Sequence, residues 1–178
     1  MVQLTLRDMI AEFTTHGAKS AKALRMLKAE RFGQFAMMTG DTAFGVVMSQ
    51  HAEGIIYGCY LRADGSYACL TNNLNVCGGL RGALCKHLLV MLSIIAVTHP
   101  RTLDTLKEWA RISGTHAPEL VFDSRRYAAY VFQQYTEATG YPIAQRTTPF
   151  PFTELPRGGA YHLFNYLDRI VVTAPPEV

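Results

Sequence analysis

The chain of 178 residues lacks the features that mark disordered, membrane-spanning and strongly nucleic-acid-binding proteins. Only 17% of its residues are charged and 49% are hydrophobic, which is the composition of a globular protein that can bury a core. The net charge of +3 is too small to indicate nucleic-acid binding by itself, although it permits a local basic patch. The sequence contains no internal repeat and no low-complexity tract, and its length predicts a single domain over residues 1–178.

Long apolar segments are also missing. The longest largely apolar run is Leu88–Val97, which is shorter than the roughly 20 residues that a membrane-spanning helix needs. Residues 1–17 include Arg7, Asp8 and Glu12, so they lack the apolar core of a signal peptide. We therefore expect a cytoplasmic protein without a membrane partner. In that compartment the four cysteines are expected to be free or metal-bound rather than paired in disulfides.

The hydrophobic pattern of the first half predicts two helices followed by an antiparallel β-meander. The first helix is expected to begin after Thr5 and to end before Gly17, and the second to cover Lys19–Glu30. Aromatic and β-branched residues then form four short runs, which turn residues separate. The four predicted strands are Phe35–Met38, Phe44–Met48, Ile55–Leu61 and Tyr67–Thr71.

The second half reads as mainly helical, which makes the predicted fold class α+β. Helices are expected over Cys85–Val97, from Leu103 to near Gly114, and from Ser124 to Ala138. Residues 142–160 carry four prolines and two glycines, so they predict an irregular segment. The pattern of Tyr161–Val172 fits a helix or a strand equally well.

One cluster of residues has the composition of a metal site. Seven residues separate Cys69 from Cys77, seven more separate Cys77 from Cys85, and one separates Cys85 from His87. Three thiolates and one imidazole form a standard tetrahedral set for structural zinc. Cys85 and His87 can meet one ion only if Cys85 lies at or just before the first helical turn, since two residues within a helix diverge by about 200°. The competing interpretation treats the four cysteines as ordinary core residues.

The predicted hairpin assigns the remaining cysteine, Cys59, to another place. If Asp64-Gly65 is a two-residue turn, Tyr60 faces Cys69 and Cys59 faces Leu70. Directly opposed residues point to the same side of a sheet, so Cys59 and Cys69 are expected on opposite faces. Cys59 is therefore expected to be a buried cysteine without a metal.

These residues carry a resemblance to a known family. The segment Tyr57–Leu92 resembles the SWIM zinc finger, in which a hairpin bearing Cys-x-Cys is followed by a variable loop and by Cys-x-His at the start of a helix. Cys85-Lys86-His87 matches the second half of that pattern, and Cys69 falls at the first cysteine. Thr71 stands where the second cysteine is expected, so Cys77 would replace it from the loop. The resemblance implies a SWIM-like hairpin–helix module over residues 57–98, with a structural zinc joining the sheet to the helix.

Several functions remain open. SWIM modules are associated with DNA-binding proteins and with protein–protein contacts, so the leading expectation is a non-catalytic zinc-binding interaction module, an adaptor or subunit of a protein assembly. A protein partner is favoured over nucleic acid, because the net charge is small and no Lys/Arg run follows one face. The alternative is a DNA-binding zinc finger, for which Arg81, Lys86, Arg125 and Arg126 would form a local patch.

An enzyme is the other alternative. Arg81 and Gly82 precede a helix start at which Lys86 also lies, and backbone N–H groups at such a start can bind an anion. The meander followed by Arg81-Gly82-Ala83 resembles the pyrophosphate-binding turn of GNAT acetyltransferases, which would imply coenzyme A as a ligand. The glycines do not match that family's motif in register, since Gly79 stands where Gln or Arg is expected. The plainer interpretation of this stretch is a solvated loop with two surface cations.

Overall fold

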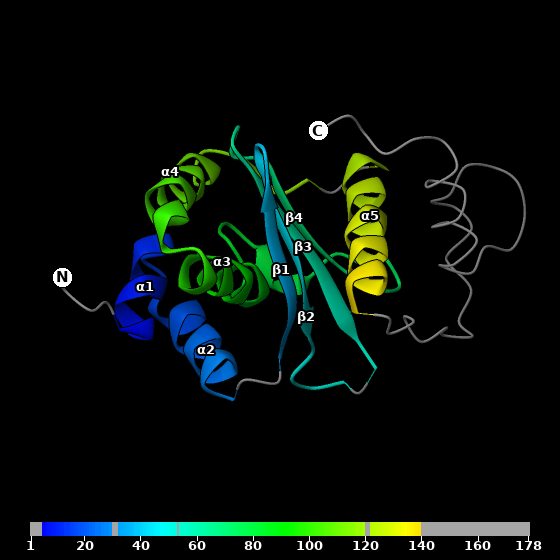
Figure 1. The fold of residues 1–178 in the computed structure, drawn as a ribbon, viewed down its shortest axis with the longest axis horizontal. Helices are drawn as coiled ribbons and strands as arrows, with labels where there is room; N and C mark the ends of the chain where they lie inside the picture. The colour runs from blue at the N-terminus through cyan, green and yellow to red at the C-terminus, as the bar shows by residue number, and fades with distance from the viewer. Residues whose placement is uncertain (1–4, 30–31, 53, 120–121, 140–178) are drawn as a thin grey trace, which may run out of the picture.

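The computed structural model describes residues 5–29, 32–52, 54–119 and 122–139 (Figure 1). Its helices are α1 (Leu6–Phe13), α2 (Gly17–Lys28), α3 (Lys86–Thr98), α4 (Leu103–Ser113) and α5 (Phe122–Thr139), with short 3-10 turns η1 (Gly78–Leu80) and η2 (Pro100–Thr102). Its strands are β1 (Gly33–Thr39), β2 (Thr42–Met48), β3 (Ile56–Arg62) and β4 (Tyr67–Thr71). The predicted α+β class, with a meander and a helical second half, is confirmed.

The four strands form one antiparallel sheet in the order β1-β2-β3-β4. Helices α1 to α4 cover one face of this sheet, and α5 covers the other (Figure 1). Side chains that alternate along the strands are therefore buried on both sides, which explains why the strands are apolar almost throughout. The fold has three layers, with helices on either side of a central sheet.

Two hydrophobic clusters follow from this layering. The larger lies between the sheet and α1 to α4, and it contains the strand residues Val47, Cys59, Leu61 and Cys69. The smaller lies between the sheet and α5, and it contains their neighbours on the opposite face, such as Tyr60 and Leu70. Each face of the sheet thus has its own hydrophobic core. The four cysteines belong to the core between the sheet and α1 to α4.

The turn between β3 and β4 differs from the predicted one. The Arg62 N–H donates to the Ser66 carbonyl at 2.9 Å, so three residues, 63–65, form the loop. Gly65 has a φ of +85°, and the Asp64 carboxylate accepts hydrogen bonds from both the N–H and the hydroxyl of Ser66. This is a three-residue loop with glycine at the left-handed position, and it competes with the two-residue turn for the same Asp-Gly pair.

The longer loop shifts the register of the hairpin by one residue. Cys59 faces Cys69, and Tyr60 faces Ala68. The prediction that Cys59 and Cys69 point to opposite faces is therefore wrong, because a shift of one residue moves every side chain to the other face.

The helical half shows smaller differences from the predictions. Gly17 was expected to follow the first helix and instead begins α2, and Ser124 lies inside α5 rather than before it. The predicted Pro-rich segment 142–160 and the element over Tyr161–Val172 lie outside the described residues. None of the described helices is long and apolar enough to cross a membrane.

Candidate metal centre

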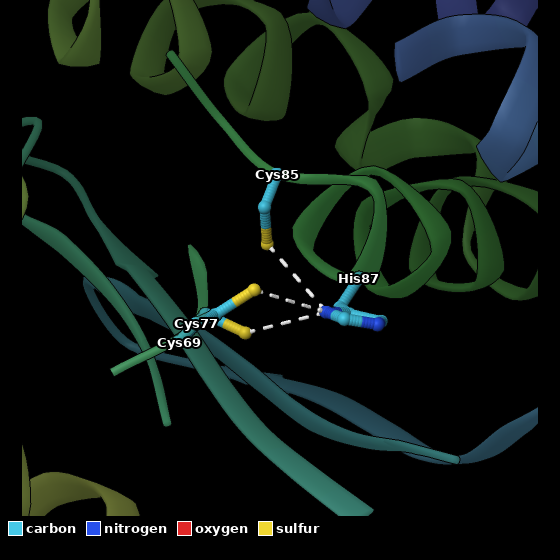
Figure 2. A group of neighbouring side chains, drawn as sticks. All are labelled: Cys69, Cys77, Cys85 and His87. Carbon is cyan, nitrogen blue, oxygen red and sulfur yellow. Dashed lines mark hydrogen bonds between the residues drawn. The ribbon is translucent and has the colours of Figure 1, made fainter. Parts of the chain in front are cut away.

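Three neighbouring parts of the chain bring the four predicted ligands together (Figure 2). Cys69 lies in the middle of β4, and Cys77 immediately precedes η1. Cys85 is the N-cap of α3, with extended backbone at φ −80° and ψ 167°, and His87 is the second residue of that helix. The predicted position of Cys85 just before the first turn is confirmed, and it allows both side chains to face one point.

Backbone hydrogen bonds hold the loop that carries Cys77 against β4. The Cys77 N–H donates to the Cys69 carbonyl at 2.9 Å, and Leu70 pairs with Val76 in an isolated antiparallel bridge. The intervening chain closes through Leu74, which has a φ of +54°. Cys77 thus occupies the position of an additional edge strand, which is why it lies near Cys69 although seven residues separate the two.

The distances are compatible with a metal ion bound by all four side chains. His87 Nδ1 lies 3.5 Å from the Cys77 sulfur, 3.7 Å from that of Cys69 and 3.9 Å from that of Cys85. All four ligand atoms lie within 4.8 Å of one another. Tetrahedral bonds of zinc to sulfur and nitrogen place sulfur and nitrogen about 3.5 Å apart, and two sulfurs about 3.8 Å apart. The four side chains can therefore hold a metal ion with little movement.

Burial and mutual hydrogen bonding set the charge of the thiols. Burial raises the pKa values of Cys69 and Cys85, which have no exposed surface. Hydrogen bonds from Cys69 and Cys85 lower the pKa of Cys77, and His87 adds to that effect. A divalent cation would displace the protons of these thiols and stabilise all three sulfurs as thiolates.

The imidazole of His87 is buried and packs against an aromatic ring. Its ring stacks on Tyr57, with the ring centroids 3.8 Å apart and an angle of 18° between the planes. Burial lowers the pKa of His87, which favours the uncharged form that binds metals. Its Nε2 atom is buried and has no hydrogen-bond partner among the described residues. Packing against Tyr57, rather than a second hydrogen bond, thus orients Nδ1 toward the three sulfurs.

Cys59 lies beside this group of four residues, on the face of the sheet opposite to the predicted one. Its sulfur lies 3.5 Å from that of Cys69, and its side chain is completely buried. The signal that would have located it is the alternative three-residue loop at Asp64-Gly65, since that register places the two cysteines opposite each other.

The predicted anion-binding residues have contacts of a different kind. The Lys19 ammonium donates to the carbonyl oxygens of Arg81 at 3.2 Å and Ala83 at 3.1 Å, so these peptide oxygens face a cation. Lys86 donates to the side-chain oxygen of Gln50 at 2.8 Å. Gly82, with a φ of +68°, allows the turn between Arg81 and Ala83. Among the described residues no strand follows α3, whereas the GNAT fold requires one there.

Comparisons of the chain with protein-family models, with curated protein sequences and with solved structures find no match. The chemistry of the cluster therefore has to indicate its function. Four protein ligands, all buried, form a closed site, and such sites are typical of structural rather than catalytic metals.

Proposed function

We propose that this protein binds one zinc ion through Cys69, Cys77, Cys85 and His87, and that it acts as a non-catalytic interaction module in a protein assembly. The observation that carries the proposal is the convergence of three sulfurs and one imidazole nitrogen within 4.8 Å, from three separate parts of the chain. Thiolates and a neutral imidazole are suited to zinc, whereas calcium and magnesium prefer oxygen ligands.

The position of the site supports a structural role. The ligands come from β4, from the turn before η1 and from the start of α3, so one ion would join the sheet to the central helix. With four protein ligands there is no open position for water or substrate. The order of hairpin, loop and Cys-x-His helix start also supports the proposed resemblance to SWIM-type modules. Function would then depend on the surface that the ion holds in shape.

Metal analysis of the purified, untagged protein tests the metal part of this proposal. We expect about one zinc per chain by mass spectrometry, and its loss in Cys85→Ser and in His87→Ala. His99→Ala is the matched control, because His99 follows α3 and lies outside the cluster. A folded wild-type protein without metal would contradict the proposal and make the cysteines core residues.

Affinity purification tests the interaction part. After nuclease treatment, the wild-type chain is expected to retain a defined protein partner that Cys85→Ser loses. A complex that disappears with nuclease would favour the nucleic-acid alternative instead.

A further inference from the structure

The positive charge of the molecule is concentrated beside the metal centre. Helix α2 has the sequence GAKSAKALRMLK, which contains four Lys or Arg residues and no acidic residue. Arg81 and Lys86 lie in the segment that leads into α3, against which α2 packs. Since the whole chain has a net charge of only +3, acidic residues must be in excess elsewhere. The distribution is therefore strongly asymmetric, in a way that the net charge conceals.

The packing of α2 against α3 brings these cations to one side of the molecule. Lys19, in the first turn of α2, bonds to the carbonyl oxygens of Arg81 and Ala83. Lys22 and Arg25 follow at intervals of three residues and are exposed. We call this set the basic surface, and it consists of Lys19, Lys22, Arg25, Arg81 and Lys86.

Among the described residues, no ion pair involves a residue of the basic surface. In the described part of the chain, the ion pairs lie on α1 and α4, between Lys107 and Glu12 or Asp104 and between Arg111 and Glu108. Like charges three residues apart destabilise a helix, and cations in its first turn oppose the helix dipole. Helix α2 also begins without a side-chain cap at His16. Arg25 and Lys28 lie in the last turn, where cations favour the dipole, so the dipole opposes Lys19 alone. The repulsion between successive cations remains, and an external ligand is the better explanation for their presence on one helix.

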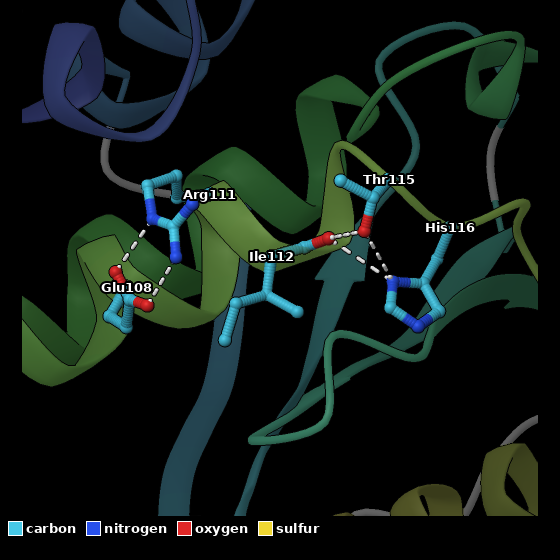
Figure 3. Close-up of polar contacts among 5 residues, drawn as sticks. All are labelled: Glu108, Arg111, Ile112, Thr115 and His116. Atoms are coloured by element: carbon cyan, nitrogen blue, oxygen red, sulfur yellow. Dashed lines mark hydrogen bonds and ion pairs between the residues drawn. The ribbon is translucent and has the colours of Figure 1, made fainter.

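A cavity adjoins this surface. It measures about 400 Å³ and opens between the α1–α2 turn, residues 82–84 and the end of α4. Its lining includes the buried apolar side chains of Phe13, Leu84 and Ala110. The charged residues at its edge, Glu12 and Arg111, are already paired, Arg111 with Glu108 as Figure 3 shows. The recess is thus partly apolar, and it lies next to the basic surface because Gly82 and Ala83, which line it, follow Arg81 in the chain.

From this combination we infer that the basic surface and the adjoining cavity bind an acidic segment of a partner protein. Its carboxylates would contact Lys22, Arg25 and Arg81, while one apolar side chain would enter the cavity. The inference rests on the proposed interaction function and names the kind of partner that this function requires. Charge complementarity and an apolar anchor are the usual elements of such recognition.

The observations favour a protein over nucleic acid. None of the Phe, Tyr and Trp side chains that the structure describes is exposed, so a platform for stacking bases is missing from this part of the chain. Helix α2 packs along both α1 and α3 and does not project as a helix would to enter a DNA groove. The phosphate backbone of a nucleic acid also has no apolar group that could enter the cavity.

Fluorescence anisotropy of the full, zinc-loaded chain tests the inference. The probes are a labelled glutamate-rich peptide with one central leucine, the same peptide with glutamate in place of leucine, a DNA duplex, a single-stranded RNA and vesicles containing phosphatidylserine. We expect the leucine peptide to bind best, and Lys22→Glu/Arg25→Glu to weaken it at least about tenfold. Arg7→Glu/Arg101→Glu carries the same charge change outside the basic surface and should leave binding within about twofold.

A second variant tests the cavity separately. Ala11 is exposed and lines the cavity, so Ala11→Trp fills it without disturbing the core. This variant should weaken the leucine peptide several-fold and leave the all-glutamate peptide unchanged.

Three results would overturn the inference. Tighter binding of DNA, RNA or vesicles would assign the surface to another ligand. Equal losses of peptide affinity in both charge-reversed variants would show that the peptide is attracted by the overall charge of the protein and not by the basic surface. A lack of peptide binding by a chain that holds one zinc would refute the inference and leave the metal site intact. Metal analysis of the same sample thus separates the two proposals, because absence of zinc refutes the proposed function on its own.

Discussion

At the scale of single residues, the cluster contains one thiol more than a four-ligand site uses. Cys59 lies directly across from Cys69, with the two sulfurs 3.5 Å apart. The three sulfurs and His87 Nδ1 already form a closed set of four atoms, so Cys59 is placed to donate its S–H to the Cys69 sulfur rather than to bind the ion. Partners of this kind orient a ligand and adjust its basicity.

Substitution of Cys59 should therefore change metal affinity without changing stoichiometry. Loss of a group that supports a ligand typically costs about 10- to 100-fold in affinity, so we expect Cys59→Ala to release zinc to a chromophoric chelator at about tenfold lower competitor concentration. Cys59→Ser keeps a donor at nearly the same position and should lose less. Both variants should still bind one zinc per chain; a fall below one would instead identify Cys59 as a ligand.

At the scale of elements, the helices and strands follow from the sequence because their hydrophobic periods are clear. The convergence of Cys69, Cys77, Cys85 and His87 could also be predicted, since a Cys-x-His pair can face one point only at a helix start. The hairpin register could not. Asp64-Gly65 suits both a two-residue and a three-residue loop, and the Asp64–Ser66 hydrogen bonds that stabilise the longer one appear only in three dimensions. Because the predicted register was wrong, the predicted position of Cys59 was wrong as well.

The basic surface was missed for a related reason. Lys19 and Arg81 lie far apart in the sequence, and only the packing of α2 on α3 brings them together. Arg125 and Arg126, the other cations considered for a patch, have side chains outside the described residues. Long-range contacts of this kind leave no periodic signal in a sequence.

The two glycines after Cys77 provide a matched test of the loop. A Cβ atom at Gly79 would lie 3.1 Å from Cys85 Cβ and 3.5 Å from the Cys77 sulfur, whereas one at Gly78 would meet nothing within 4 Å. Gly79→Ala should therefore push two ligands apart and weaken zinc binding several-fold, and Gly78→Ala should not. The chelator competition described for Cys59 measures both. Equal affinities would show that the loop yields readily and does not set the geometry of the site.

At the scale of the whole molecule, the site lies in only one of the two cores. Cys69, Cys77 and Cys85 belong to the cluster between the sheet and α1 to α4, and the cluster beneath α5 contains none of the ligands. A metal ion would thus hold together the side of the sheet where β4 meets α3, while α5 packs on Tyr60 and Leu70. Removal of metal should affect the two faces unequally.

Chelation of the purified protein should lower its melting temperature. It should also destabilise the cluster between the sheet and α1 to α4 before the cluster beneath α5. An ion present at a thousand times its dissociation constant stabilises the folded state by about 4 kcal/mol, and 1 kcal/mol changes Tm by about 2–4 °C in a chain of this size. We therefore expect Tm to fall by about 10 °C with a strong chelator and to recover when zinc is restored. Hydrogen exchange should accelerate in β4 and at the start of α3 more than in α5. Cys85→Ser should start from the lower Tm and show no response to the chelator. An unchanged Tm in a wild-type sample that has lost its zinc would mean that packing alone holds the sheet against α3.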